Sequence, residues 1–154
     1  VFMAQAQEDI KILNGDIAVD DRGSLRFINE FDFKDVKRFY QVENHDDDTV
    51  RAFHGHMKEA KYVYVASGSI ILCLAKLNAN KKLDKNTKVE KLVLSAAKPK
   101  IVYVPSGYAN GFKALEENTK IIFFSTTTLQ ESLGDDYRFP YDFFGEEIWE
   151  VENR

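Results

Sequence analysis

The segment Lys61-Tyr-Val-Tyr-Val-Ala-Ser-Gly-Ser-Ile-Ile-Leu-Cys-Leu74 decides the fold class of this chain. It holds two short runs of β-branched, aromatic and aliphatic residues on either side of the turn-forming pair Ser-Gly, a composition typical of strands. Five similar runs lie at residues 25–28, 38–42, 89–94, 101–104 and 120–125. No long stretch between them has the 3.6-residue apolar period of a helix, so the sequence predicts an all-β sandwich or barrel.

Residues 70–74 are apolar at every position, so a strand there would present apolar side chains on both of its faces. One face could meet the core and the other a partner subunit, which predicts a homodimer. Helix is expected only in short pieces, near residues 32–36 or in the C-terminal tail.

Composition and charge limit the classes of function. With 154 residues, 44% of them hydrophobic, we expect one domain over residues 1–154, with residues 1–14 as an N-terminal extension or dimer arm. The 25 acidic residues outnumber the 21 basic ones, so nucleic acid is not an expected partner. No apolar run approaches the ~20 residues that cross a bilayer. Because the single Cys73 has no disulfide partner, we predict a cytoplasmic protein with no membrane partner.

One segment that could carry chemistry is Arg-Ala-Phe-His-Gly-His-Met-Lys-Glu-Ala-Lys at residues 51–61. Residues two apart on a strand point to the same face, so His54 and His56 would project together. Such a pair could bind a metal, or one ring could act as a base while the other orients a substrate. Lys61 is seven positions after His54, so it can reach the same side only if a turn or bulge intervenes.

A second segment is Val-Pro-Ser-Gly-Tyr-Ala-Asn-Gly-Phe at residues 104–112. Together with the histidine pair it resembles the paired motifs of the cupin superfamily, whose fold is a double-stranded β-helix, or jelly-roll barrel. Metal-binding cupins have a histidine where Asn110 stands, and an amide oxygen is a poor transition-metal ligand. They also have three or four residues between the second histidine and the following glutamate, whereas only two separate His56 from Glu59. We therefore expect no metal and no other cofactor.

Four motifs in order resemble a metal-free branch of the cupins, the enzymes that act on dTDP-4-keto-6-deoxy sugars. They are Asp-Asp-Arg-Gly-Ser-Leu at 20–25, Arg-Ala-Phe-His at 51–54, Lys-Tyr-Val-Tyr-Val-Ala-Ser-Gly at 61–68 and Pro-Ser-Gly-Tyr-Ala-Asn-Gly-Phe at 105–112. The tail resembles the family's closing Asp-Pro and Ile-x-Trp, so the resemblance runs from about Gly15 to Trp149. It implies an isomerase for a nucleotide-linked, dTDP-type sugar and, since the related enzymes are dimers, a homodimer.

Two activities share this scaffold. Residues 105–112 and the tail are more similar to the dTDP-4-dehydrorhamnose 3,5-epimerases, and residues 37–40 and the His54–His56 pair to the dTDP-4-keto-6-deoxyglucose 3,4-ketoisomerases. In the epimerases a tyrosine after the last long strand is the general acid, and residues 124–131 contain none. We therefore expect epimerisation at C3 alone, with ketoisomerisation as the alternative and a sugar-binding protein without activity as a third.

The resemblance implies roles for four residues in moving a proton beside the sugar ketone. His54 would be the base, and Lys61 would face the oxyanion that develops at O4. Tyr40 and His56 are the candidates for the acid or proton shuttle, although Tyr40 is equally suited to packing on a sheet.

Four further residues are expected to bind the substrate. Arg22 and Arg51 would hold the diphosphate, because guanidinium groups suit phosphate oxygens. Asn110 and Tyr108 would contact the substrate from the second segment, and Tyr108 suits packing or base stacking equally.

Overall fold

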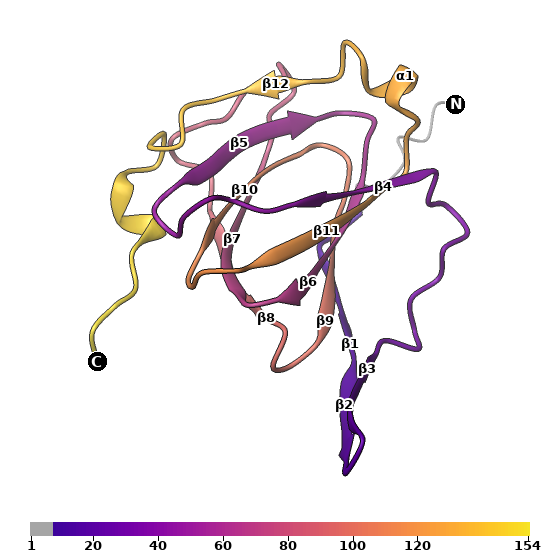
Figure 1. Ribbon diagram of the computed structural model, residues 1–154. Helices are drawn as coiled ribbons and strands as arrows, with labels where there is room; N and C mark the ends of the chain where they lie inside the picture. Colours follow the sequence, from indigo (N-terminus) through magenta and orange to yellow (C-terminus); the bar gives the residue numbers. More distant parts are fainter. Residues whose placement is uncertain (1–7) are drawn as a thin grey trace.

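The computed structural model describes residues 8–154 and consists mainly of antiparallel strands (Figure 1). The strands are β1 (Lys11–Asn14), β2 (Asp16–Asp20), β3 (Gly23–Phe27), β4 (Arg38–Val42), β5 (Val50–His56), β6 (Lys61–Ser67), β7 (Ser69–Lys76), β8 (Glu90–Ser95), β9 (Lys100–Val104), β10 (Tyr108–Ala114), β11 (Lys120–Ser125) and β12 (Tyr137–Arg138). The sheet orders are β1-β9-β6-β11-β4 and β12-β5-β10-β7-β8. The predicted all-β jelly-roll barrel is confirmed.

The core lies between the two sheets. Val63 and Val65 of β6 pack in one cluster with Leu72 and Leu74 of β7, and all four side chains are at most 2% exposed. Full burial of an aliphatic side chain of this size stabilises a fold by about 1.5–3 kcal/mol. The alternating apolar positions of β6 therefore fix which of its faces points inward, and hence which residues are available to a site.

The other face of β7 is covered by the C-terminal tail. Ile71 and Cys73 belong to a second cluster with Phe53 of β5 and Trp149, which ends the 3-10 helix η1 (Glu146–Trp149). The Trp149 indole donates to a backbone carbonyl of the tail, that of Tyr141, at 2.9 Å. The expectation that a partner subunit covers this face was therefore wrong, because the chain supplies the cover itself.

The predicted strands overlap observed ones, but the helices differ. The helix expected near residues 32–36 is not formed; that segment makes turns. The α-helix α1 (Leu129–Ser132) instead follows β11, and the Thr128 hydroxyl and the Glu131 carboxylate form its capping box. The helix η1 fits the expectation for the tail. Strands β1, β2 and β12 were not predicted, since each is short and largely exposed.

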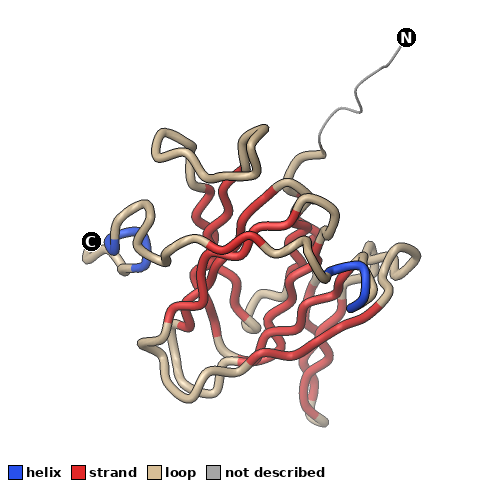
Figure 2. The backbone as a smooth tube through the Cα atoms, turned by 90° about the horizontal axis from the view of Figure 1, so that it is seen from above, coloured by secondary structure: helices blue, strands red, loops and turns tan. Residues whose placement is uncertain are grey.

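Two features lie outside the barrel. Strands β2 and β3 form their own two-stranded sheet, which extends away from the larger sheets (Figure 1). Figure 2 shows the two short helical segments at the periphery of the strands. Within residues 8–154 no helix has the length and apolar character needed to cross a membrane.

Candidate functional site

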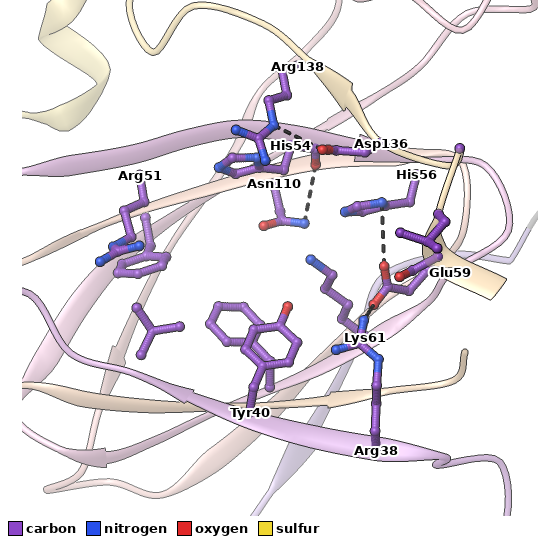
Figure 3. Close-up of a pocket in the computed structure, with 16 residues that line it drawn as sticks. Arg38, Tyr40, Arg51, His54, His56, Glu59, Lys61, Asn110, Asp136 and Arg138 are labelled. Carbon is purple, nitrogen blue, oxygen red and sulfur yellow. Dashed lines mark hydrogen bonds and ion pairs between the residues drawn. The ribbon is translucent and has the colours of Figure 1, made fainter. Parts of the chain in front are cut away.

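A cavity of about 510 Å³ opens between the two sheets (Figure 3). Its walls come from β4, β5, β6, β10 and β11, and from the segment after α1. This volume is in the usual range for small-molecule sites. Polar and charged side chains line most of the cavity, and apolar side chains that include Phe112 and Phe123 form its floor. The cavity can therefore hold a polar ligand and remove part of the ligand's surface from water.

His54, His56 and Lys61 line this cavity together. The two histidines share one face of β5, as their spacing predicted, and Lys61 begins β6 after a turn at residues 57–60. The buried Asp135 carboxylate holds that turn by accepting the backbone N–H groups of residues 57, 58 and 59 at 2.8, 3.0 and 3.1 Å. The turn that the odd His54–Lys61 separation required is therefore present, and it is rigidly fixed.

The ring of His56 is held from one side only. Its Nδ1 atom lies 2.6 Å from the backbone carbonyl oxygen of Asp135 and 3.4 Å from a carboxylate oxygen of Glu59. Its Nε2 atom is buried and has no hydrogen-bond partner among the described residues. Burial and the neighbouring Lys61 lower the pKa of His56, and Glu59 opposes them. The ring is therefore neutral near pH 7.

His54 is less constrained. Burial is the main cause that lowers its pKa, followed by the charges of Lys61 and Arg138, while Asp136 acts in the opposite direction. The amide of Asn110 donates to the backbone carbonyl of His54 at 3.4 Å, which joins the second sequence segment to the first. His54 is thus also neutral near pH 7 and able to accept a proton.

Four cations line the cavity: Arg38, Arg51, Lys61 and Arg138. Arg38 pairs with Glu59 at 3.2 Å and Arg138 with Asp136 at 2.9 Å. Lys61 is only 7% exposed and forms no ion pair with any carboxylate of residues 8–154. A buried ammonium group without a counter-ion is costly, so this position is suited to a negative charge on a ligand.

Tyr40 stands on β4 opposite the histidines. Its ring stacks on Phe123 at 5.1 Å with an interplanar angle of 13°, and the Lys61 Nζ atom lies 5.8 Å from the ring centre. Figure 3 shows the hydroxyl directed into the cavity, on the side of Lys61. The ring therefore packs on the sheet while the hydroxyl remains available, so both roles expected for Tyr40 are compatible with its position.

Two predicted binding residues do not reach this cavity within one chain. Arg22 lies at the turn of the β2–β3 hairpin, where its 86% exposed side chain pairs with Asp20 at 2.6 Å. Tyr108 lines a separate hollow beside β1 and β8. The expectation that both join His54 in one site is not met in a single chain, because the hairpin projects away from the barrel and Tyr108 lies with Ile10 and Leu92 around the second hollow. Arg51 and Asn110 do line the cavity.

The sequence analysis did not identify four residues that line the cavity, Arg38, Glu59, Asp136 and Arg138, or Ser125, which donates a hydrogen bond to Glu59. Arg38 could have been found, since it is two positions before Tyr40 on one strand and shares its face. Glu59 is in the turn between two strands, where a charge is normally solvated. Strand β12 is two residues long, so Asp136 and Arg138 carry no periodic signal.

The residues of the cavity do not form a metal centre of the usual kind. No group of three or more histidine, cysteine, aspartate or glutamate side chains in residues 8–154 is arranged to hold a metal ion. Asn110 pairs with the His54 backbone in the register of β5 and β10, at the position where metal cupins have a histidine.

Comparison with known proteins places the chain in a family. A family model described as dTDP-4-dehydrorhamnose 3,5-epimerase matches residues 5–137. The spore coat polysaccharide biosynthesis protein SpsL of Bacillus subtilis is 26% identical over 126 residues, which are 80% of this chain and 82% of that protein.

Two solved structures share the fold. The dTDP-4-dehydrorhamnose 3,5-epimerase of Bacillus anthracis, with TDP and PPi bound, has a TM-score of 0.75 and 20% identity, and the match covers 94% of this chain and 87% of that one. The WlaRB TDP-quinovose 3,4-ketoisomerase of Campylobacter jejuni has a TM-score of 0.64 and 23% identity, over 89% of this chain and 98% of its own. Because the family model spans most of the sequence, this protein belongs to the dTDP-4-dehydrorhamnose 3,5-epimerase family.

Proposed function

We propose that this protein isomerises a dTDP-linked 4-keto-6-deoxyhexose by removing the proton at C3, beside the ketone, and returning it so that C3 is inverted. The observation that carries the proposal is the juxtaposition, in one cavity, of a neutral histidine and a buried lysine that has no counter-ion among residues 8–154. A base and a cation are the two groups that abstraction of a proton beside a ketone requires.

Each group has a task in this reaction. His54 takes the C3 proton, since its lowered pKa keeps the ring neutral at pH 7. Lys61 stabilises the enolate at O4, where the negative charge develops. Tyr40, whose hydroxyl faces the cavity, supplies the proton on return, or His56 does so after its Nε2 atom has taken up a proton from solvent.

Inversion at C3 alone is proposed because no acid stands where the double epimerases have their tyrosine. That stretch, at the end of β11, holds Ser125 and Thr127 instead, and both are buried. The Ser125 hydroxyl donates to Glu59 at 2.6 Å, so it is engaged with a residue of the cavity wall and does not itself line the cavity.

The 3,4-ketoisomerase activity is the second candidate, and the second histidine favours it. Moving hydrogen between C3 and C4 converts a 4-ketone to a 3-ketone and needs a group that can carry a proton from one carbon to the next. His56 faces the same cavity as His54, and one of its ring nitrogens, which has no partner in the described part of the chain, could carry that proton.

We further propose that the working unit is a homodimer in the cytoplasm. The outer face of the sheet that contains β4, β6 and β11 carries a group of touching aromatic rings: Phe31, Phe33, Phe39, Tyr62 and Phe124. Phe33 and Phe39 are 60% and 68% exposed, which makes this patch suitable for a second copy. In such a dimer the projecting hairpin could bring Arg22 to the partner's cavity. Sedimentation as a 17.7 kDa monomer at micromolar concentration would refute this part.

The reaction is tested by incubating the protein with dTDP-4-keto-6-deoxyglucose in D2O and following deuterium at C3 and C5 by NMR. We expect exchange at C3 with little at C5, and an inverted 4-ketone as product. A 3-ketone product would favour the ketoisomerase, and exchange at neither carbon would leave only a sugar-binding protein.

The matched variant is His54→Asn, which keeps a polar side chain but removes the base. We expect it to slow C3 exchange by about 10²-fold or more while dTDP binding changes little. Full C3 exchange in this variant would show that His54 is not the base.

A further inference from the structure

We infer that Glu59 is a positioning residue for His56: its carboxylate stabilises the protonated ring that forms when Nε2 takes up a proton from solvent, before that proton is passed to the substrate carbon. The inference rests on the proposed function, because it makes His56 the group that returns a proton to the substrate. It differs from that proposal in being testable without turnover.

The backbone of Asp135 sets the tautomer of His56. A carbonyl oxygen accepts hydrogen bonds and cannot donate, so the 2.6 Å contact requires a proton on Nδ1 of His56. In the neutral ring Nε2 is then the acceptor. Figure 3 shows this nitrogen directed toward Asn110 and Lys61, away from Glu59. His56 is therefore a ring whose basic nitrogen is reserved for the interior of the site.

Glu59 supplies a negative charge on the opposite side of the ring. Its carboxylate is 3% exposed, and one of its oxygens lies 3.4 Å from Nδ1 of His56. The other oxygen accepts from the Ser125 hydroxyl at 2.6 Å and from the Arg38 guanidinium at 3.2 Å. Buried carboxylates need such partners to persist. The orientation of the carboxylate is thus fixed by strands on the opposite sheet, β4 and β11.

The basic Nε2 atom of His56 faces the cavity, and the carboxylate of Glu59 lies on the other side of the ring. The same order is typical of sites in which a third residue orients a base. The charged groups that act on His56 are Glu59 from the turn, Asp135 from the segment before β12, and Lys61 from β6. Glu59 and Asp135 favour the charged ring and Lys61 disfavours it. Glu59 offsets part of the effect by which Lys61 lowers the pKa of His56. Removal of the Glu59 charge should therefore lower that pKa further and make Nε2 a weaker base.

The other histidine provides an internal control. His54 faces Asp136, whose carboxylate also favours the charged ring, but Asp136 is 40% exposed and is paired with Arg138. Glu59→Gln and Asp136→Asn are the same chemical change, a carboxylate to an amide, beside two different rings. We expect each variant to lower the pKa of its own histidine and to leave the other within a few tenths of a unit.

The experiment is a ¹⁵N NMR titration of the histidine side chains in the unliganded full chain. In the wild type His56 should show a protonated Nδ1 and an unprotonated Nε2 above its pKa. In Glu59→Gln its pKa should fall by about one unit, which corresponds to a roughly tenfold weaker base. A wild-type His56 with its proton on Nε2 would overturn the inference. Because this result needs the wild-type protein alone, the inference can be tested even when a variant does not fold.

Kinetics separate a positioning role from general damage. Glu59→Gln should lower kcat for C3 exchange roughly tenfold without raising KM, because the change removes negative charge from a site that binds an anion. A KM that rises while kcat and the His56 titration stay unchanged would overturn the inference. Absence of C3 exchange in the wild type would end the proposed function, and the titration would still decide whether Glu59 acts on His56.

Discussion

The corner between β5 and β6 and the hairpin of β2 and β3 carry candidate site residues in opposite physical settings. At the corner, Glu59 and Asp135 are each 3% exposed and accept hydrogen bonds or ion pairs from several elements. In the hairpin, Arg22 is 86% exposed and its ion-pair partner is two residues away in the same turn. One chain supplies all the contacts that hold the side chains at the corner. In the hairpin, by contrast, Asp20 of the same turn is the side chain that Arg22 pairs with, and this pair leaves the arginine exposed.

This difference separates the tasks that each region can perform. Proton transfer needs groups held within tenths of an ångström, which the buried network around His56 provides. Binding of a flexible diphosphate tolerates a mobile arginine, provided that something brings it close. The comparison therefore predicts that changes at the corner affect chemistry or folding, and that changes at the hairpin affect binding.

Lys61→Met should produce the largest effect. Methionine preserves the apolar stem of this buried residue but removes the charge that would stabilise the enolate, and loss of one such group costs about 10²–10³-fold in rate. C3 deuterium exchange is the measurement. Lys58→Met, in the exposed part of the adjoining turn, is the matched control and should exchange normally. Wild-type exchange by Lys61→Met would remove the lysine from the mechanism.

Asp135→Asn should give the largest loss of stability at the corner. The carboxylate accepts three backbone N–H groups, and an amide, with one acceptor oxygen, cannot replace it. We expect about 2 kcal/mol less free energy of unfolding, measured by urea denaturation. The control is Asp136→Asn, the next residue, whose exposed ion pair should contribute less than about 1 kcal/mol. Equal losses of unfolding free energy in the two variants would mean that the hydrogen bonds accepted by Asp135 do not hold the turn.

Arg22→Ala should raise KM roughly tenfold and change kcat little, the scale of one charged hydrogen-bonded contact. Lys88→Ala is the control, because that side chain is 84% exposed and pairs locally with Glu90 on β8. If Arg22→Ala and Lys88→Ala both keep the wild-type KM, the hairpin takes no part in binding. The expected division of tasks between the hairpin and the corner is then wrong.

The smallest expected effect is on the pH profile. Burial and Lys61 lower the pKa of both His54 and His56 from 6.5, so both rings remain neutral as the pH falls to that value. The kcat/KM for exchange should therefore change less than about twofold between pH 8 and 6.5, and fall only at more acidic pH. A rate that already falls by half at pH 7 would show that the acceptor has a raised pKa, contrary to its surroundings in the cavity.

The sequence predicted the parts of the molecule that depend on local pattern. The alternating residues of β6 and the continuous apolar run of β7 gave the fold class, and the two-residue spacing of His54 and His56 gave their common face. The need for a turn before Lys61 followed from counting residues. Each of these inferences uses only the geometry of a strand.

What the sequence could not provide depends on contacts between distant segments. Asp135 and Glu59 are 76 residues apart, and Ser125 and Glu59 are 66 apart, so nothing local indicates that they meet. The cover over β7 could not be assigned either, because an apolar face does not specify whether the tail or a partner buries it. Tyr108 lies instead with Ile10 and Leu92 around a separate hollow, and contacts between segments this far apart in the chain cannot be derived from spacing.

The burial of Cys73 has a consequence for following the motions of the barrel. Its side chain is fully buried, and burial raises the pKa of the thiol to about 12. Because alkylating reagents attack the thiolate, the folded molecule should be silent toward them at neutral pH. Each adduct then requires an opening of the sheet around β7, and at reagent concentrations where alkylation is faster than reclosing the rate of mass gain measures how often the core opens. The single native cysteine therefore serves as a probe for opening of the core, and no further cysteine has to be introduced.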